Sequence, residues 1–439
     1  MNPAPAAHDA AGAHTGRLAW AVLVIAVLLN FLGRGMADSF TAFVLPLEQH
    51  FGWRRSDITG VFASYMLVNG LFAPVAGLLF DRFGPRLVYC SGLVALGAGA
   101  LLASRAESLG QLYLSAGLLV GIGACATGQT CATALIARWY RVRLATAIAL
   151  VYAGAGAGML VMVPLAQTLI EAAGWRMSWQ WLGWFMLALC PLCAALPWGR
   201  LARPRDRAAG PSLARASGES VSRDGTHDPV MPHASARDGP GVFDALRSPA
   251  FWRLVQVFFF TAFATYLVTP QVVAYLIEIG LPPLVAASSY GVAGLLSTVG
   301  VVAAGWLSDR FGVQLVALGS LGSSTLGMAC LLLATWWPGM TAVLLFVACF
   351  GIAQGARGPI VSTLCNRIFA GPSAAAINGL VFTSLAFGAS LGAWLGGLIR
   401  DLADGYQPVF LLSMFMFALA AEAFRSRSTL IRIAASARR

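Results

Sequence analysis

Two arginines, Arg34 and Arg357, each lie well inside a long apolar stretch of the chain. A helix that begins near Leu18 rises about 1.5 Å per residue and places Arg34 well inside a hydrocarbon slab of ~30 Å. A guanidinium at that depth costs on the order of 2.5–3.5 kcal/mol, so we expect it to face a cavity or a partner. Guanidinium groups bind carboxylates through paired hydrogen bonds, so one such arginine in each half predicts a site for an organic anion.

Asp38 follows Arg34 by four residues, a spacing that allows an ion pair along one helix face. The pair could be structural, or a substrate carboxylate could replace Asp38 on Arg34; the two interpretations are compatible. Asp38 is the carboxylate most clearly inside an apolar stretch, which makes it the candidate for proton coupling. Tyr65 and Tyr266 are candidate substrate contacts, although polar groups also tie membrane helices together at ~0.6 kcal/mol each.

The elements that must hold these side chains are membrane spans. Hydrophobic residues make up 58% of the 439 residues and charged residues only 11%, whereas soluble domains carry roughly 25% charged residues. The apolar runs predict an all-α membrane protein with twelve transmembrane helices in two six-helix bundles, a 6+6 pseudo-repeat. The predicted spans are 18–44, 58–80, 86–104, 109–135, 144–171, 178–199, 251–278, 284–307, 314–335, 340–365, 375–399 and 406–424.

Polar segments set the boundaries of the two bundles. Residues 200–248 combine Arg, Asp, Pro, Gly and Ser with few aromatic residues, which predicts a flexible linker, since such a segment cannot bury enough surface to fold. A regulatory docking site is the alternative for this linker. The full predicted division is a disordered leader (1–17), an N-terminal bundle (18–199), the linker (200–248), a C-terminal bundle (249–426) and a basic tail (427–439).

The basic residues predict the orientation in the membrane. The 29 basic residues are all Arg, and most fall on one side if the N-terminus is cytoplasmic. We therefore predict an inner (plasma) membrane protein with both termini and the linker in the cytoplasm. The net charge of +11 then reflects topology and contact with the lipid bilayer, not binding to nucleic acid. Five arginines fall on the external side: Arg54, Arg55, Arg105, Arg176 and Arg400.

The sequence offers no constellation for an enzyme, a metal or a cofactor. The eight cysteines lie in or beside the predicted spans without the pattern of a disulfide framework. The five histidines lie in the leader, an outer loop and the linker, so we expect no metal site. A Walker loop, a His-Glu-x-x-His pair and a nucleophile elbow are all missing from the sequence. We expect a protein that is not an enzyme and is not driven by ATP.

A short charged turn occurs once in each half, between two apolar runs. Gly77-Leu-Leu-Phe-Asp81-Arg82-Phe83-Gly84, followed by Arg86, returns as Gly305-Trp-Leu-Ser-Asp309-Arg310-Phe311-Gly312. The glycines allow a tight turn, and Asp81 could accept hydrogen bonds from a helix N-terminus of the opposite half, held by Arg82 or Arg86. The duplicated turn predicts a conformational latch on the cytoplasmic side. A solvated turn is the alternative.

The duplicated Gly-x-x-x-Asp-Arg-x-Gly turn in a 6+6 chain resembles the major facilitator superfamily over essentially the whole sequence. The resemblance implies two six-helix bundles around a central site that opens to each side in turn. Two further stretches resemble the bacterial branch related to monocarboxylate transporters. They are Gly33-Arg34-x-x-x-Asp38-Ser39-Phe40 and Gly355-Ala-Arg357-Gly358-Pro359.

These observations predict a monomeric secondary active transporter of a small organic anion. The resemblance suggests a monocarboxylate as the substrate, and protons are the candidate coupling ion. An exporter of hydrophobic or cationic compounds is the main alternative, but two buried arginines against one buried acid disfavour it. A non-transporting membrane sensor is a third hypothesis and would be expected to carry an ordered signalling domain.

Overall fold

The computed structural model describes residues 6–140, 144–201, 242–337, 339–369 and 374–424. These residues form helices and short connections without a β-strand, so the prediction of an all-α fold is confirmed. Among the described residues, nine helical segments are long and apolar enough to cross a membrane. The chain is therefore a multi-pass membrane protein. Most of the predicted linker (202–241) and the predicted tail lie outside the described residues.

The N-terminal half begins earlier than the first predicted span. Its first helix starts at Ala6, inside the predicted leader, where alanine-rich sequence has a high helix propensity. Only Ser39 separates the first two helices, so together they form one span. The elements of this half are α1 (Ala6–Asp38), α2 (Phe40–Phe51), α3 (Arg55–Ser104), α4 (Leu109–Leu112), the π-helix η1 (Tyr113–Leu119), α5 (Val120–Thr127), α6 (Gln129–Ala137), α7 (Leu144–Ala195) and α8 (Trp198–Leu201).

Two helices of this half are too long to cross a bilayer once. The 50 residues of α3 and the 52 residues of α7 would each extend about 75 Å if straight. Gly84 (φ 81°, ψ 169°) interrupts α3, and Gly174 (φ 78°, ψ 165°) interrupts α7. A side chain would be strained in these backbone conformations, which glycine adopts freely. Both breaks fall between consecutive predicted spans.

The C-terminal half has a similar build with shorter helices. Its last helix is apolar but only 16 residues long. The elements are α10 (Val242–Arg247), α11 (Pro249–Val268), the 3₁₀ helix η2 (Thr269–Gln271), α12 (Val272–Glu278), α13 (Pro283–Phe311), α14 (Val313–Ala334), α15 (Met340–Ile368), α16 (Ala374–Ala403) and α17 (Gln407–Glu422).

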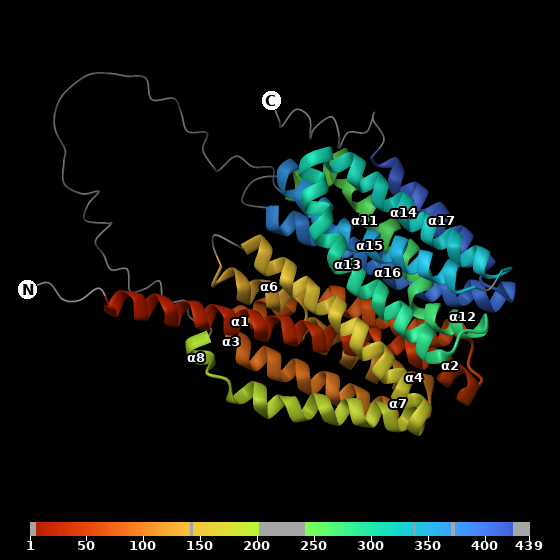
Figure 1. The fold of residues 1–439 in the computed structure, drawn as a ribbon, viewed down its shortest axis with the longest axis horizontal. Coiled ribbons are helices and arrows are strands. Elements are labelled where there is room, and N and C mark those ends of the chain that lie inside the picture. Colours follow the sequence, from red (N-terminus) through yellow and green to blue (C-terminus); the bar gives the residue numbers. More distant parts are fainter. Residues whose placement is uncertain (1–5, 141–143, 202–241, 338, 370–373, 425–439) are drawn as a thin grey trace, which may run out of the picture.

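Two clusters of buried hydrophobic side chains lie mainly one in each half, and each includes a few residues of the other half. The halves lie side by side and meet where α3 packs on α16 and α7 packs on α13 (Figure 1). At one end of the molecule α2, α4 and α12 lie near one another, and α6 and α8 lie at the opposite end (Figure 1). We call the first the Arg55 end, after the first residue of α3, and the second the Asp81 end. The arginine distribution predicts that the Arg55 end is external.

Candidate functional site

Arg34 and Asp38 form the ion pair that their spacing predicts. The Arg34 Nε donates to Asp38 Oδ2 over 2.8 Å on the last turn of α1. The Asp38 side chain is only 1% exposed, whereas the Arg34 side chain is 32% exposed. The second carboxylate oxygen of Asp38 is buried without a hydrogen-bond partner. The pair therefore combines a buried acid with a partly exposed cation.

Arg34 also contacts the other half of the molecule. Its Nη2 donates to the hydroxyl of Tyr266 on α11 over 3.0 Å. Tyr65 of α3 and Tyr290 of α13 are buried nearby, close enough to Arg34 and Asp38 to interact with both electrostatically. The Tyr65 hydroxyl has no hydrogen-bond partner. Tyr65 and Tyr266 are among the predicted substrate contacts, whereas Tyr290 is not, because nothing in its local sequence distinguishes it from other buried tyrosines.

Arg357 lies in different surroundings from Arg34. It is 9% exposed, and its guanidinium donates to Thr265 of α11 over 2.8 Å and to Ser324 of α14. The guanidinium carbon lies 4.8 Å from the centre of the Phe417 ring on α17. These partners all belong to the C-terminal half, and Nε has no hydrogen-bond partner. The structure therefore does not bring Arg34 and Arg357 onto a shared partner.

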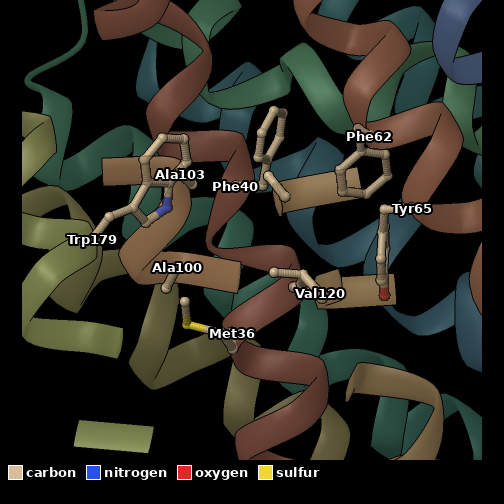
Figure 2. A pocket seen from close by; sticks show the side chains of 10 residues that line it. Met36, Phe40, Phe62, Tyr65, Ala100, Ala103, Val120 and Trp179 are labelled. Carbon is tan, nitrogen blue, oxygen red and sulfur yellow. The ribbon is translucent and has the colours of Figure 1, made fainter. Parts of the chain in front are cut away.

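A small apolar pocket lies within the N-terminal half. Figure 2 shows Trp179 and Tyr65 on opposite sides of it, with Met36 and Phe40 of α1 and α2 between them. Met36 and Phe40 flank Asp38 in sequence, and Tyr65 lies near Arg34 as well. The pocket lining is Met36, Ala37, Phe40, Phe62, Tyr65, Ala100, Ala103, Ala116, Val120 and Trp179. The lining consists of apolar and aromatic side chains.

The duplicated turns share their backbone geometry. Gly84 and Gly312 both have positive φ, 81° and 87°, and the space beside Gly77 and Gly305 is open. Gly84 interrupts α3 at the Asp81 end, and Gly312 separates α13 from α14. The positive φ explains the glycines at positions 84 and 312, whereas nothing in the structure explains Gly77 and Gly305.

The charged residues of the turns make contacts within their own half. The Asp81 carboxylate is held by Arg138 over 2.8 Å, not by Arg82 or Arg86 as its sequence neighbours suggested. Arg138 also lies over the Phe80 ring, at 5.0 Å. Arg82 and Arg310 lie over neighbouring aromatic rings, and Arg86 is exposed. The side chain of Asp309 lies outside what the structure describes. The predicted latch to the opposite half thus stays a prediction.

A second charged cluster lies at the Arg55 end, and the sequence analysis did not select it. Arg55 is 1% exposed and forms ion pairs with Glu48 of α2 and with Glu278 of α12, the latter over 2.6 Å. Its Nη1 also donates to the Tyr406 hydroxyl over 2.9 Å. An available signal was the position of Arg55 on the predicted external side, against the positive-inside bias. Within the described residues, no three His, Cys, Asp or Glu side chains are placed to hold a metal ion.

The fold and this site define a class of protein: a helical multi-pass membrane protein with a charged pair at the junction of two halves. A sequence model of the Major Facilitator Superfamily matches residues 23–393 and 299–429. The chain belongs to the Major Facilitator Superfamily. Among curated proteins it is similar to monocarboxylate transporter 13 of Bos taurus, with 28% identity over 400 residues, 91% of this chain and 86% of the relative. It is similar to monocarboxylate transporter 11 of Mus musculus, with 28% identity over 418 residues, 94% of this chain and 87% of the relative.

Solved structures with the same fold include three transporters. A bacterial homolog of the human lysosomal transporter Spinster, in an inward-facing and unoccupied conformation, has a TM-score of 0.67 at 17% identity over 96% of this chain and 98% of its own. A nucleoside transporter has a TM-score of 0.70 at 15% identity over 92% and 98% of the two chains. A D-xylose–proton symporter has a TM-score of 0.67 at 16% identity over 94% and 99%. The chain is thus a superfamily transporter related to monocarboxylate transporters.

Proposed function

We propose that this protein is a secondary active transporter of a small monocarboxylate, coupled to protons and working by alternating access. The observation that carries the proposal is the contact of Arg34 with Asp38 in its own half and with Tyr266 in the other. A substrate carboxylate that replaces Asp38 on Arg34 would leave Asp38 buried without its cation. Because a buried lone carboxylate is costly, Asp38 would then take up a proton. Anion and proton would bind together, and the site would keep its charge.

The helices support twelve membrane crossings in this proposal. Gly84 and Gly174 divide α3 and α7 into two crossings each, and α17 supplies the last. Six crossings then precede the predicted linker and six follow it. The predicted orientation has a direct test in a cysteine-free background. A membrane-impermeant thiol reagent added outside is expected to label Gln49→Cys at the Arg55 end and not Ser217→Cys in the linker, and labelling at position 217 would contradict it.

The substrate class is tested by uptake into proteoliposomes. Purified protein is reconstituted and given radiolabelled monocarboxylates, dicarboxylates or organic cations with the external solution acidified. We expect accumulation of a monocarboxylate that a protonophore abolishes and that the Arg34→Gln variant lacks. Arg105→Gln is the matched control because Arg105 is exposed in the loop that follows α3. Transport of organic cations without transport of any carboxylate would favour the exporter hypothesis instead.

A further inference from the structure

The charged cluster at the Arg55 end joins the two halves through one buried cation. Arg55 begins α3, and its guanidinium lies between Glu48 of the same half and Glu278 of the other. Tyr406 of the C-terminal half accepts from Arg55 and donates to Glu278 over 3.4 Å. Burial raises the pKa of the Tyr406 hydroxyl, so this group stays protonated and can do both.

Two further hydrogen bonds across the halves reach the backbone at the start of α3. Asp401, near the end of α16, accepts from the backbone N–H of Arg55 over 3.0 Å and from that of Ser56 over 2.8 Å. Arg54 occupies the cap position of α3, and its side chain makes no capping hydrogen bond. A carboxylate at a helix N-terminus satisfies free N–H groups and complements the helix dipole. Gly397 allows this approach, since a side chain there would collide with Thr59 and Ser56.

The members of the ion pair that crosses the halves each have a second partner in their own half. Arg55 has Glu48, and Glu278 has Arg400, whose Nη2 lies 3.7 Å from Glu278 Oε2. If the halves separate, Arg55 keeps a carboxylate and Glu278 keeps a cation. Neither charge is then left uncompensated, which is the usual large cost of breaking a buried ion pair.

We propose that these residues form the gate of the Arg55 end, built from two charge pairs, Arg55–Glu48 and Glu278–Arg400, that dock when the gate closes. The inference rests on membership of the superfamily and not on the substrate class. Glu278 acts across the halves and stabilises the closed state. Glu48 and Arg400 stabilise the open state more than the closed state. In the closed state Arg55 and Glu278 are also paired with each other, so each depends less on its partner in its own half. Glu48 and Glu278 then also compete for the guanidinium of Arg55. Removing the charge of Glu278 is therefore expected to favour the open state, whereas removing the charge of Glu48 or Arg400 is expected to favour the closed state.

The gate is tested by measuring its opening without any substrate. Spin labels at the exposed positions Gln49 and Leu402 in a cysteine-free background report the distance between the halves by pulsed electron spin resonance in nanodiscs. Glu278→Gln is expected to raise the ratio of open to closed molecules by roughly three- to tenfold. Glu48→Gln and Arg400→Gln are each expected to lower that ratio by a similar factor. Asp401→Ala, which uncaps α3, is expected to raise it.

The matched control is Glu107→Gln, which removes an exposed carboxylate in the loop between α3 and α4. The control is expected to leave the ratio within about twofold of the unmodified protein. A variant is scored only if it elutes as a single species in size-exclusion chromatography. If Glu278→Gln does not fold, Asp401→Ala and Arg400→Gln still test the opposite changes in the ratio of open to closed molecules. Shifts in the same direction for Glu278→Gln and Glu48→Gln, or shifts no larger than the control, would overturn the proposal.

Discussion

Arg34 and Arg357 both lie among apolar helices, yet the structure gives them different kinds of partner. Arg34 shares a buried carboxylate of its own half and a hydroxyl of the other half, and its side chain is 32% exposed. Arg357 is 9% exposed and is held by two hydroxyls and an aromatic ring of the C-terminal half. One arginine therefore lies at the junction of the halves, and the other lies within a single half.

The difference teaches which buried cation can bind a ligand and which can hold a helix bundle together. A cation paired with a carboxylate can exchange that partner for a substrate carboxylate of equal charge. Arg357 has only neutral hydrogen-bond partners, two hydroxyls of its own half, and its Nε has none, so it has no carboxylate that a substrate could replace. The sequence-based hypothesis that both arginines clamp one carboxylate thus stays a prediction, and the variants below separate it from a site with Arg34 alone.

Arg34→Gln is expected to have the largest effect on binding. Loss of a charge-assisted, partly buried contact should weaken carboxylate affinity on the order of hundredfold. Arg34→Lys keeps the charge but loses the planar fork, so its loss should be smaller than that of Gln. Isothermal titration calorimetry of the purified protein measures both, with Arg105→Gln as control. An affinity for Arg34→Gln within threefold of the unmodified protein would remove Arg34 from the site.

Asp38→Asn is expected to change how affinity depends on pH. If Asp38 takes up a proton when the anion binds, the affinity of the unmodified protein falls as the pH rises, by up to about tenfold per unit. An amide cannot take up this proton, so the variant should bind with an affinity that does not vary with pH. Titrations between pH 5 and pH 9 check this, and a slope that persists in the variant would show that another group carries the proton.

Tyr266→Phe is expected to have a smaller effect. It removes the hydroxyl that Arg34 contacts across the halves, and a bond of this kind contributes about 1 kcal/mol, roughly a fivefold change in affinity. Tyr140→Phe is a matched control, since it removes a tyrosine hydroxyl that donates within the N-terminal half, to the Ala19 carbonyl. Unchanged affinity in Tyr266→Phe would show that Arg34 binds without help from the C-terminal half.

Arg357→Gln is expected to change affinity least, by less than about threefold. Its effect should appear in stability, because Thr265, Ser324 and Phe417 lose their common partner. We expect the apparent Tm to fall by about 3–6 °C. A thermal scan with and without ligand separates the two effects. A loss of affinity as large as that of Arg34→Gln, with an unchanged Tm, would support the hypothesis that both arginines bind the substrate carboxylate.

The sequence predicted the elements of this fold better than the contacts between them. Apolar runs located the helices, and the four-residue spacing located the Arg34–Asp38 pair, because both depend on residues near one another in the chain. The bond from Arg34 to Tyr266 depends on how two distant helices pack. The same is true of Arg357: helix length indicated its depth, but an apolar helix does not show which face a single arginine occupies.

The cluster around Arg55 also depends on contacts between distant helices, which the sequence did not reveal. Its members come from α2, α3, α12 and α16 and from the connection before α17, so no local pattern joins them. An arginine on the predicted external side was visible in the sequence, but its carboxylate partners were not. The duplicated turn was the most informative local signal, and the positive φ of Gly84 and Gly312 explains why glycine occupies the same place in both copies.

Joint binding of an anion and a proton at Arg34 and Asp38 is the central proposal for this protein. Counting protons during binding tests this most directly: a monocarboxylate identified by uptake is mixed with purified protein in weakly buffered solution near neutral pH, and the pH change is converted to protons per anion bound. The account predicts uptake of about one proton per anion by the unmodified protein and none by Asp38→Asn. Anion binding without proton uptake by the unmodified protein would contradict it.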